Sequence, residues 1–260
     1  MKKLINYLLY LIVTLSAVFI INNIINFSKK TILLNEHQGL AALRSETMLQ
    51  PVVRLSQIFY SSTNVEGGMQ SLESATFATG FSAMYLGSTN ETIILTNDHF
   101  CNSLDEDTTL IVENYLGQIV YGAPKNANAL ISSTRNDMDL CALKIKGYVK
   151  PAKIKGKDYT PTLFEEVFVV GSPSGDFPII IDTYLSSLIS RKKVALGNMS
   201  SLSSSGNDFL MISEQIFPGH SGSPIYTKDG EVIGILFGAL RSYGGLGAGH
   251  EDIHSFLEAL

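Results

Sequence analysis

The hydrophobic pattern divides the chain into an apolar N-terminal segment and a long region of short apolar runs. Residues 4–27 are almost entirely apolar, and the uninterrupted core of that segment, residues 7–21, becomes long enough to cross a bilayer when it is extended to residue 25. After Pro51, short apolar runs alternate with Gly, Ser and Thr, which is typical of many short β-strands. The pattern therefore predicts an all-β domain over residues 51–260, preceded by an apolar helix.

Two interpretations of the N-terminal segment compete. A basic start, Lys2 and Lys3, followed by an apolar stretch fits a cleavable signal peptide. However, residues 20–25 contain no small residue that would make a cleavage site, so we favour an uncleaved, single-pass membrane anchor over residues 1–28. Because Lys29 and Lys30 balance the two lysines at the start, the distribution of positive charge does not decide the orientation of this anchor.

Helical spacing of apolar residues appears in two further places. Residues 29–50 combine helix formers with apolar positions near helical spacing, which fits a juxtamembrane stalk helix or a surface for homo-oligomerisation, and fits a solvated spacer equally well. Residues 252–260 carry Ile253, Phe256 and Leu257 on one helical face. The second pattern predicts an amphipathic C-terminal helix.

Composition narrows the classes of partner. The chain has 260 residues, enough for one two-lobed domain and a modest extension. It carries 19 basic and 24 acidic residues, a net charge of −5, and no cluster of Lys or Arg. This charge balance argues against a nucleic-acid partner.

The most informative motif is Gly219-His220-Ser221-Gly222-Ser223-Pro224. Glycines around Ser221 allow a tight, open turn in which the backbone amides of Gly219 and Ser221 can point at one place. A serine hydroxyl is a poor nucleophile unless a base takes its proton and donors stabilise the oxyanion that forms. The turn therefore predicts a nucleophile and an oxyanion hole, provided that a base and an orienting acid lie elsewhere in the chain.

Two upstream residues supply these partners. His99 follows directly after a short apolar strand, and Asp139 stands at the start of another, 140–145. A carboxylate at such a position can accept a hydrogen bond from an imidazole N–H and leave the other ring nitrogen free as a base. We therefore predict a catalytic triad of His99, Asp139 and Ser221, in that chain order.

The surroundings of these residues resemble the chymotrypsin-fold serine peptidases, specifically their HtrA-like branch. The similar motifs occur in the family's order over residues 51–260: 78–83, 95–99, 139–145, 167–175 and 219–234. The resemblance implies two antiparallel β-barrels with the active cleft between them and the predicted C-terminal helix closing the second. It also implies a serine endopeptidase that cleaves protein or peptide substrates through an acyl-enzyme, without a cofactor or metal, on the outer side of a membrane. We expect no peptide-binding PDZ domain after the predicted barrels.

Two departures from the family pattern motivate an alternative. Ser223 stands where the family usually has glycine, and His220 stands where zymogen-activated members have aspartate. The alternative function is a catalytically silent, membrane-tethered relative that uses the cleft to bind protein. Shared fold alone does not prove activity, so the retained triad residues favour the enzyme.

The resemblance also indicates a substrate pocket. One wall would come from the strand 234–240 and the other from the segment 215–218, giving the pocket residues Gln215, Ile216, Phe217, Phe237 and Gly238. None of these residues is an acid that could pair with Arg or Lys. We therefore expect a hydrophobic pocket that accepts a small or medium aliphatic side chain.

The two cysteines, Cys101 and Cys141, each lie two residues beyond a predicted catalytic group. If His99 and Asp139 meet, these cysteines cannot be far apart, so a disulfide is one interpretation. Two reduced, buried cysteines that pack as small apolar residues are the commoner outcome, and we favour them.

A competing motif occurs near the C-terminus. Residues 250–254, His-Glu-Asp-Ile-His, fit the His-Glu-x-x-His pattern of zinc proteases. Those sites need a third protein ligand, normally downstream, and the printed chain ends at Leu260. We therefore predict no metal site and assign His250 and His254 to the C-terminal helix.

Overall fold

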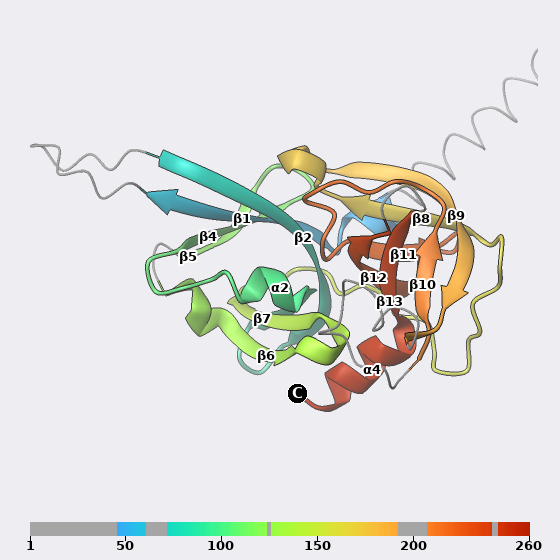
Figure 1. Cartoon of the computed structure of the whole chain (residues 1–260). Helices are drawn as coiled ribbons and strands as arrows, with labels where there is room; N and C mark the ends of the chain where they lie inside the picture. The colour runs from blue at the N-terminus through green and yellow to red at the C-terminus, as the bar shows by residue number, and fades with distance from the viewer. Residues whose placement is uncertain (1–45, 61–71, 124–125, 192–206, 241–243) are drawn as a thin grey trace, which may run out of the picture. The chain divides into compact units, whose positions relative to one another are not determined.

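The described part of the chain folds as two β-sheets that share an apolar cluster. The computed structural model describes residues 46–60, 72–123, 126–191, 207–240 and 244–260 (Figure 1). All strands pair antiparallel within the two sheets. The chain is therefore mostly β, as the sequence predicts.

The first sheet has seven strands in the order β5-β4-β1-β2-β3-β7-β6. These strands are β1 (Val52–Tyr60), β2 (Leu72–Leu86), β3 (Glu91–Thr96), β4 (Thr109–Asn114), β5 (Ile119–Ala123), β6 (Ile131–Arg135) and β7 (Leu140–Lys146). Over the described ranges no ladder joins the edge strands β5 and β6, so this sheet is a half-barrel rather than the closed barrel that we expected. The reason lies in its edges: both strands are short, and the chain between them forms a 3-10 turn, η1 (Ala127–Leu130), which packs against β6 and β7.

The second sheet closes on itself as a six-stranded barrel in the order β10-β13-β12-β11-β8-β9. Its strands are β8 (Glu166–Gly171), β9 (Ile179–Ile189), β10 (Phe209–Ile212), β11 (Pro224–Thr227), β12 (Val232–Ala239) and β13 (Gly245–Gly249). Closure leaves no unpaired edge, and the nearly continuous apolar run of β12 is buried on both faces. The predicted second barrel is confirmed.

Few helices accompany the sheets. The one-turn helix α2 (Asp98–Cys101) follows β3, and two 3-10 turns, η2 (Asn136–Met138) and η3 (Pro173–Gly175), precede β7 and β9. The C-terminal helix α4 (His250–Glu258) packs on β12 and β13 with Ile253 and Phe256 buried. It thus forms where the amphipathic pattern predicts it, beginning two residues earlier.

The segments before the first sheet are described only in part. Over the described residues, no helix combines the length and apolar character that a bilayer crossing requires. The predicted anchor, 1–28, and most of the predicted stalk, 29–50, lie outside those residues. The end of that stalk packs on the barrel: Met48 is 3% exposed, and its carbonyl accepts a hydrogen bond of 2.9 Å from the hydroxyl of Tyr226.

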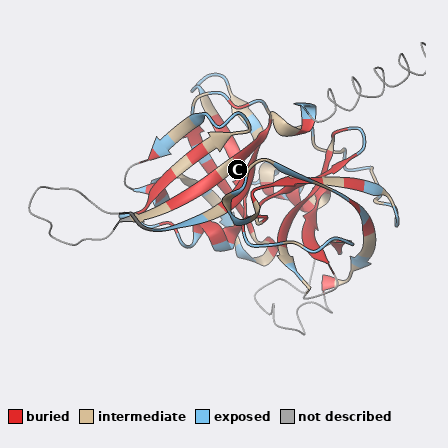
Figure 2. Cartoon of the chain, turned by 90° about the horizontal axis from the view of Figure 1, so that it is seen from above, coloured by how far each residue is buried: buried red, intermediate tan, exposed pale blue. Residues whose placement is uncertain are grey.

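The apolar core has three parts, whose buried strands appear in red in Figure 2. One cluster fills the concave side of the first sheet and includes Leu55 and Leu143, and another fills the closed barrel and includes Val169 and Ile225. The third lies between the two sheets and joins residues of β2 and β3 to residues of β12 and α4. Because the sheets share this third cluster, it holds the elements on which the site is built.

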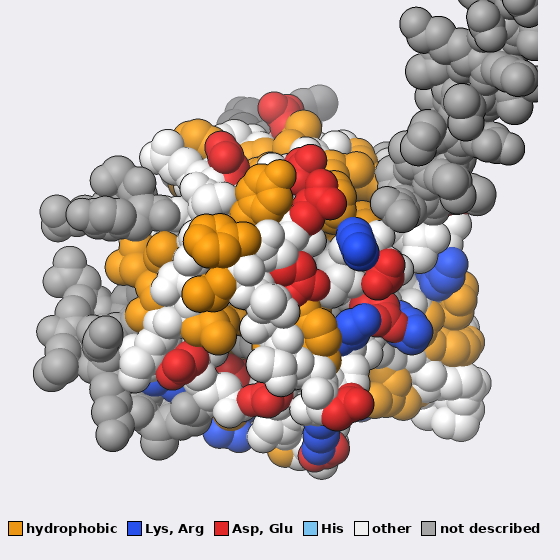
Figure 3. Space-filling model, turned by 90° about the vertical axis from the view of Figure 1, so that its right-hand side faces the viewer, with side chains coloured by type: hydrophobic (Ala, Val, Ile, Leu, Met, Phe, Trp, Pro, Cys, Tyr) orange, Lys and Arg blue, Asp and Glu red, His pale blue; other side chains and the backbone are white. Residues whose placement is uncertain are grey.

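The outer face of β9 carries large apolar side chains. Ile180 and Tyr184 are 41% and 52% exposed. Figure 3, which views the side on which β9 and β10 lie, shows hydrophobic side chains interspersed with basic and acidic ones. This face is therefore mixed in character rather than dominated by one sign of charge.

The register of the first sheet brings distant residues together. Thr96, the last residue of β3, pairs with Cys141 near the start of β7. Because the two strands run antiparallel, the segment that leaves β3 lies beside the segment that enters β7. The structure therefore brings α2 and the residue before β7 to the same edge.

Candidate active site

His99 sits on α2, directly after the buried strand β3. The other three residues of this one-turn helix, Asp98, Phe100 and Cys101, are buried, whereas His99 is exposed. Burial of those three side chains anchors the turn. The imidazole therefore projects from a held backbone toward the space between the two sheets.

Asp139 links η2 to β7 and adopts a left-handed backbone conformation with φ of 52°. Aspartate tolerates this region better than most residues do. Its carbonyl accepts a hydrogen bond of 3.0 Å from the side-chain amide of Asn97, which ties the turn to the end of β3. This geometry turns the carboxylate of Asp139 toward α2.

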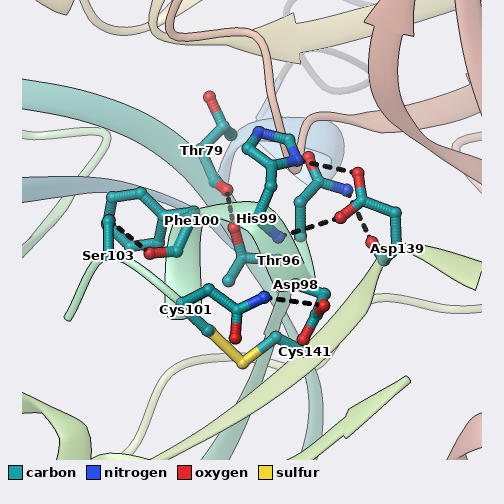
Figure 4. The surroundings of a disulfide bond; sticks show 11 residues. Thr79, Thr96, Asp98, His99, Phe100, Cys101, Ser103, Asp139 and Cys141 are labelled. Carbon is teal, nitrogen blue, oxygen red and sulfur yellow. Dashed lines mark hydrogen bonds and ion pairs between the residues drawn. A yellow bond between two sulfur atoms is a disulfide. The ribbon is translucent and has the colours of Figure 1, made fainter. Parts of the chain in front are cut away.

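The carboxylate of Asp139 contacts His99 twice (Figure 4). One oxygen, Oδ2, lies 2.7 Å from Nδ1 of His99, and the other accepts a 2.9 Å hydrogen bond from the backbone N–H of His99. An ionised carboxylate only accepts hydrogen bonds, so Nδ1 must carry the proton. Nε2 is then left with a lone pair, and it lies 3.1 Å from Oγ of Ser221.

The surroundings also set the basicity of His99. Partial removal of the ring from water by itself lowers the pKa of His99, but the hydrogen bond and the negative charge of Asp139, with the charge of Asp98, outweigh this effect. The pKa of His99 is therefore raised above its ordinary value of 6.5. A base of this strength can accept a proton from a hydroxyl at near-neutral pH.

The turn that carries Ser221 requires its glycines. Gly219 and Gly222 have φ of 100° and 83°, a region that residues with a Cβ rarely adopt. A Cβ on Gly219 would lie 2.0 Å from the carbonyl oxygen of Ser172, and one on Gly222 would lie 1.9 Å from that of Thr79. The spacing of glycines around the serine is thus a consequence of close backbone packing on both sides.

Hydrogen bonds fix most peptide groups of this turn. The carbonyls of Pro218, Gly219, His220 and Ser221 accept hydrogen bonds from Ser174 N, Thr79 Oγ1, Ser223 N and Thr79 N. The amides of His220, Gly222 and Ser223 also have backbone acceptors. Within the described part of the chain, the amides of Gly219 and Ser221 have no acceptor. These are the two amides that the sequence assigns to an oxyanion hole.

The sequence of this chain matches one known protein family. The family model for a trypsin-like peptidase domain matches residues 78–235, well over half of the chain. This chain belongs to the trypsin-like peptidase family. Serine-type endopeptidase, the enzyme class expected from the sequence, is the class of this family. No match was found among curated proteins.

Solved structures with the same fold include HtrA-type proteases. The protease AlgW with a tripeptide aligns with a TM-score of 0.61 and 17% identity over 84% of this chain and 62% of that one. The serine endoprotease from Yersinia pestis aligns with a TM-score of 0.59 and 19% identity over 83% of this chain and 64% of that one. This chain thus spans less than two thirds of each of these proteins, and at these identities the likeness concerns the fold.

The two departures from the family pattern, His220 and Ser223, lie in the turn that carries Ser221. His220 is 1% exposed, and its Nδ1 lies 3.1 Å from the backbone N–H of Phe217. Burial lowers the pKa of His220, which keeps this ring neutral. Ser223 is fully buried, and a Cβ on Gly171 would lie only 2.2 Å from its Oγ. Neither side chain takes part in the contacts that join Asp139, His99 and Ser221.

The predicted pocket residues separate into two groups. Gln215 and Phe217 are exposed, and Ile216 is half-buried in the same loop, before the turn that carries Ser221. Phe237 instead packs edge-on against Phe209 with ring centroids 5.0 Å apart and is 6% exposed. The side chain of Phe237 therefore belongs to the core between the sheets, and half-buried Gly238 is its neighbour on β12.

The two cysteines form a disulfide, so our prediction of two free, buried thiols is wrong. Cys101 of α2 and Cys141 of β7 are bonded, with their Cα atoms 6.4 Å apart (Figure 4). The register that pairs Thr96 with Cys141 brings the two segments within reach of each other. The bond joins the element that carries His99 to the strand that follows Asp139.

The two histidines of the His-Glu-x-x-His motif at the start of α4 make packing contacts and hydrogen bonds within the fold. The ring of His250 is 2% exposed and meets the ring of Tyr159 edge-on, and Nε2 of His254 lies 2.7 Å from the carbonyl of Lys155. A ring nitrogen that faces a carbonyl oxygen must carry a hydrogen and donate a hydrogen bond to it. No group of three or more His, Cys, Asp or Glu side chains is arranged to hold a metal in the regions that the structure describes.

The sequence did not indicate the residues that support the site through hydrogen bonds to its segments. Asp98 is buried, and its Oδ2 accepts hydrogen bonds from the side chains of Asn102 and Asn136. It thereby ties α2 to η2. Thr79 lies in the motif 78–83 that resembles the family, but nothing in the sequence indicates its hydrogen-bond partners.

Proposed function

We propose that this protein is a serine endopeptidase in which Ser221 is the nucleophile, His99 the general base and Asp139 the residue that orients His99. The observation that carries the proposal is the line of contacts from Oδ2 of Asp139 to Nδ1 of His99, 2.7 Å, and from Nε2 of His99 to Oγ of Ser221, 3.1 Å. The second distance is within the range in which a proton can pass from a nucleophile to its base, and the first is a hydrogen bond that orients the imidazole.

The reaction proceeds in two halves. Oγ of Ser221 attacks the scissile carbonyl as its proton passes to Nε2 of His99, and a C–O bond forms. His99 then gives that proton to the leaving amine as the C–N bond breaks, which leaves an acyl-enzyme. In the second half, water attacks the ester, His99 takes the proton of the water, and the proton returns to Oγ as the acid product leaves.

The amides of Gly219 and Ser221 are the proposed oxyanion donors. In a trans peptide the N–H points away from the carbonyl of the preceding residue. The carbonyls of Pro218 and His220 are held by Ser174 N and Ser223 N, so the two amides that follow are directed away from those contacts. Donors held in advance stabilise the charge of the tetrahedral intermediate without reorganisation during the reaction.

The proposed substrate is a protein or peptide with a small or medium aliphatic side chain before the scissile bond. Ile216 contacts Gly245 of β13, where a Cβ would lie 2.9 Å from its Cγ2, so an apolar side chain lies at the predicted pocket. Glu214 is the acid nearest in sequence, and its side chain is exposed. A basic substrate side chain would therefore lack a buried counter-charge.

We place the peptidase on the outer side of a membrane, anchored through residues 1–28. The apolar character of that segment supports the anchor. The disulfide supports an oxidising compartment, because such bonds persist there and are rare in the cytosol. Alkaline extraction of membranes, with protease accessibility from either side, tests this placement. Self-association through residues 29–50 stays a prediction.

Labelling with a fluorophosphonate tests the proposed chemistry. The wild-type protein should label and hydrolyse a peptide library with aliphatic residues before the cleaved bond, whereas Ser221→Ala and His99→Ala should do neither. Ser223→Ala is the matched control, because this neighbouring serine is buried and its hydroxyl makes no hydrogen bond in the described structure. A folded wild-type protein that takes no label would refute the enzyme and favour the protein-binding alternative.

A further inference from the structure

Thr79 on β2 makes four hydrogen bonds close to the nucleophile turn. Its hydroxyl donates to the carbonyl of Gly219 at 2.8 Å and accepts from the backbone N–H of Ser172 at 3.0 Å. Its backbone N–H donates to the carbonyl of Ser221 at 2.8 Å, and its carbonyl accepts from the hydroxyl of Thr96 at 2.8 Å. Thr79 is fully buried, so water does not compete for these groups.

We propose that Thr79 is a positioning residue for the oxyanion hole, whose hydroxyl holds the peptide groups on both sides of the Gly219 Cα. The inference rests on the serine-peptidase function proposed above and names a residue that acts through the Gly219 amide rather than on substrate. Its basis is the pair of bonds that one hydroxyl makes to two different segments.

The first peptide group is held directly. Glycine at φ of 100° has access to many values of ψ, so the backbone itself does little to orient the group between Gly219 and His220. The bond from Thr79 Oγ1 fixes the carbonyl of Gly219 toward the first sheet. The opposite end of that group, the His220 N–H, meets the carbonyl of Phe217 at 3.1 Å.

The second peptide group is held through η3. The N–H of Ser174 donates to the carbonyl of Pro218 at 2.8 Å, and this bond aims the Gly219 N–H the other way. Ser174 has a left-handed backbone with φ of 53° and lies two residues after Ser172, whose N–H bonds to the Thr79 hydroxyl. Removing the Thr79 hydroxyl therefore leaves the carbonyl of Gly219 without its donor. It also releases Ser172, at the start of the loop whose Ser174 N–H holds the carbonyl of Pro218.

A second support of η3 comes from the same sheet. Nη1 of Arg54 on β1 donates to the carbonyl of Gly175 at 2.6 Å, and Nη2 pairs with Glu113 at 2.6 Å. Thr79 and Arg54 therefore hold the two ends of η3 from the first sheet, while the turn itself belongs to the second. The donor geometry of the turn depends in this way on contact between the two sheets.

Thr79→Val removes the hydroxyl and keeps the branched shape. We expect kcat to fall about tenfold to a hundredfold, less than the roughly 10²- to 10³-fold cost of deleting an oxyanion donor outright. KM should change little, and the midpoint of the pH profile should not move, because the His99–Asp139 pair is untouched. Thr79→Ser keeps the hydroxyl and should restore most of kcat.

Thr92→Val is the matched control. Thr92 on β3 is also fully buried, and its hydroxyl likewise donates to a carbonyl, Gly147 at 2.7 Å, and accepts from an N–H, Val149 at 3.1 Å. The chemistry of the substitution is the same, but none of its partners lies in the turn. Thermal unfolding of both valine variants of the full chain measures the general cost of losing such a hydroxyl, and kcat should fall only in Thr79→Val.

Two further measurements keep the result decisive. A methyl group in place of the Thr79 hydroxyl faces two polar groups, so Thr79→Ala serves as a second variant if the valine protein does not fold. Hydrogen exchange of residues 217–223 should quicken in Thr79→Val and Thr79→Ala, and not in Thr79→Ser or Thr92→Val. Equal kcat and equal exchange for folded Thr79 and Thr92 variants would overturn the positioning role. Absence of label on the wild type would instead refute the proposed function, and exchange would still decide the role of Thr79.

Discussion

Replacing Cys101 and Cys141 together with alanine tests how far the stability of the first sheet depends on the bond between them. The two residues are 40 positions apart in the chain, so the bond closes a loop that the unfolded chain would otherwise explore freely. In the chain-entropy relation a loop of this length corresponds to about 4 kcal/mol. For a domain of this size that is a fall in Tm of about 8–16 °C.

The position of the disulfide beside His99 and Asp139 leads to a second expectation, for kcat. The closed loop, residues 101–141, contains β4, β5, η1, β6 and η2. Asp139 lies just inside one end of the loop, and His99 lies two residues before the other end. Asn97 and Asp98 make other hydrogen bonds across the same two segments, so the paired geometry should persist in the folded variant. We therefore expect kcat to change less than threefold at temperatures well below the lowered Tm, a figure of order 0.6 kcal/mol or less.

Urea unfolding of three proteins measures the effect: the oxidised wild type, the double alanine variant, and the wild type refolded under reducing conditions. The reduced protein keeps both sulfur atoms, so it separates the bond from the packing of two fully buried side chains. A difference in free energy of unfolding below about 1 kcal/mol between the oxidised and reduced proteins would refute the loop-closure reasoning. A large loss of kcat without loss of stability would show instead that the bond acts on the triad.

Two other predictions concern charged groups. Because the pKa of His99 is raised and only its neutral form accepts a proton, kcat/KM should rise with pH through a midpoint above 6.5, and Asp98→Asn should move that midpoint down; a midpoint below 6.5 would contradict the charge argument. Arg191→Met removes a guanidinium that is 2% exposed, pairs with Asp252 and lies over the ring of Phe209 at 4.4 Å. Leaving that carboxylate buried should lower the free energy of unfolding by about 3–5 kcal/mol in urea, and adding Asp252→Asn should recover part of it; no change in the single variant would contradict the reasoning.

Much of the candidate site could be predicted because its chemistry is local in the sequence. His99 and Asp139 stand at strand ends, where an apolar run meets a polar turn, and Ser221 stands between turn-forming glycines. Such signals depend on residue type and spacing alone. The barrel and the C-terminal helix were also predictable, since short apolar runs and helical spacing recur along the chain.

Contacts between distant segments were not predictable. The sequence left the pairing of Cys101 with Cys141 open, because a disulfide depends on where two strands meet. It also placed Phe237 in the pocket, although β12 turns that ring into the core. The first sheet stays open because η1 lies between its edge strands, which no pattern of hydrophobic positions indicates.

One physical reason separates the features that the sequence predicts from those that it does not. Hydrophobic period, turn residues and reactive side chains are properties of neighbours along the chain, so the sequence by itself determined the element types, the family resemblance and the three candidate reactive residues. The direction of a peptide group depends on a partner that can lie more than a hundred residues away, as the hydroxyl of Thr79 does for the carbonyl of Gly219. Only the packing of the two sheets against each other decided which amides of the turn remain available to a substrate.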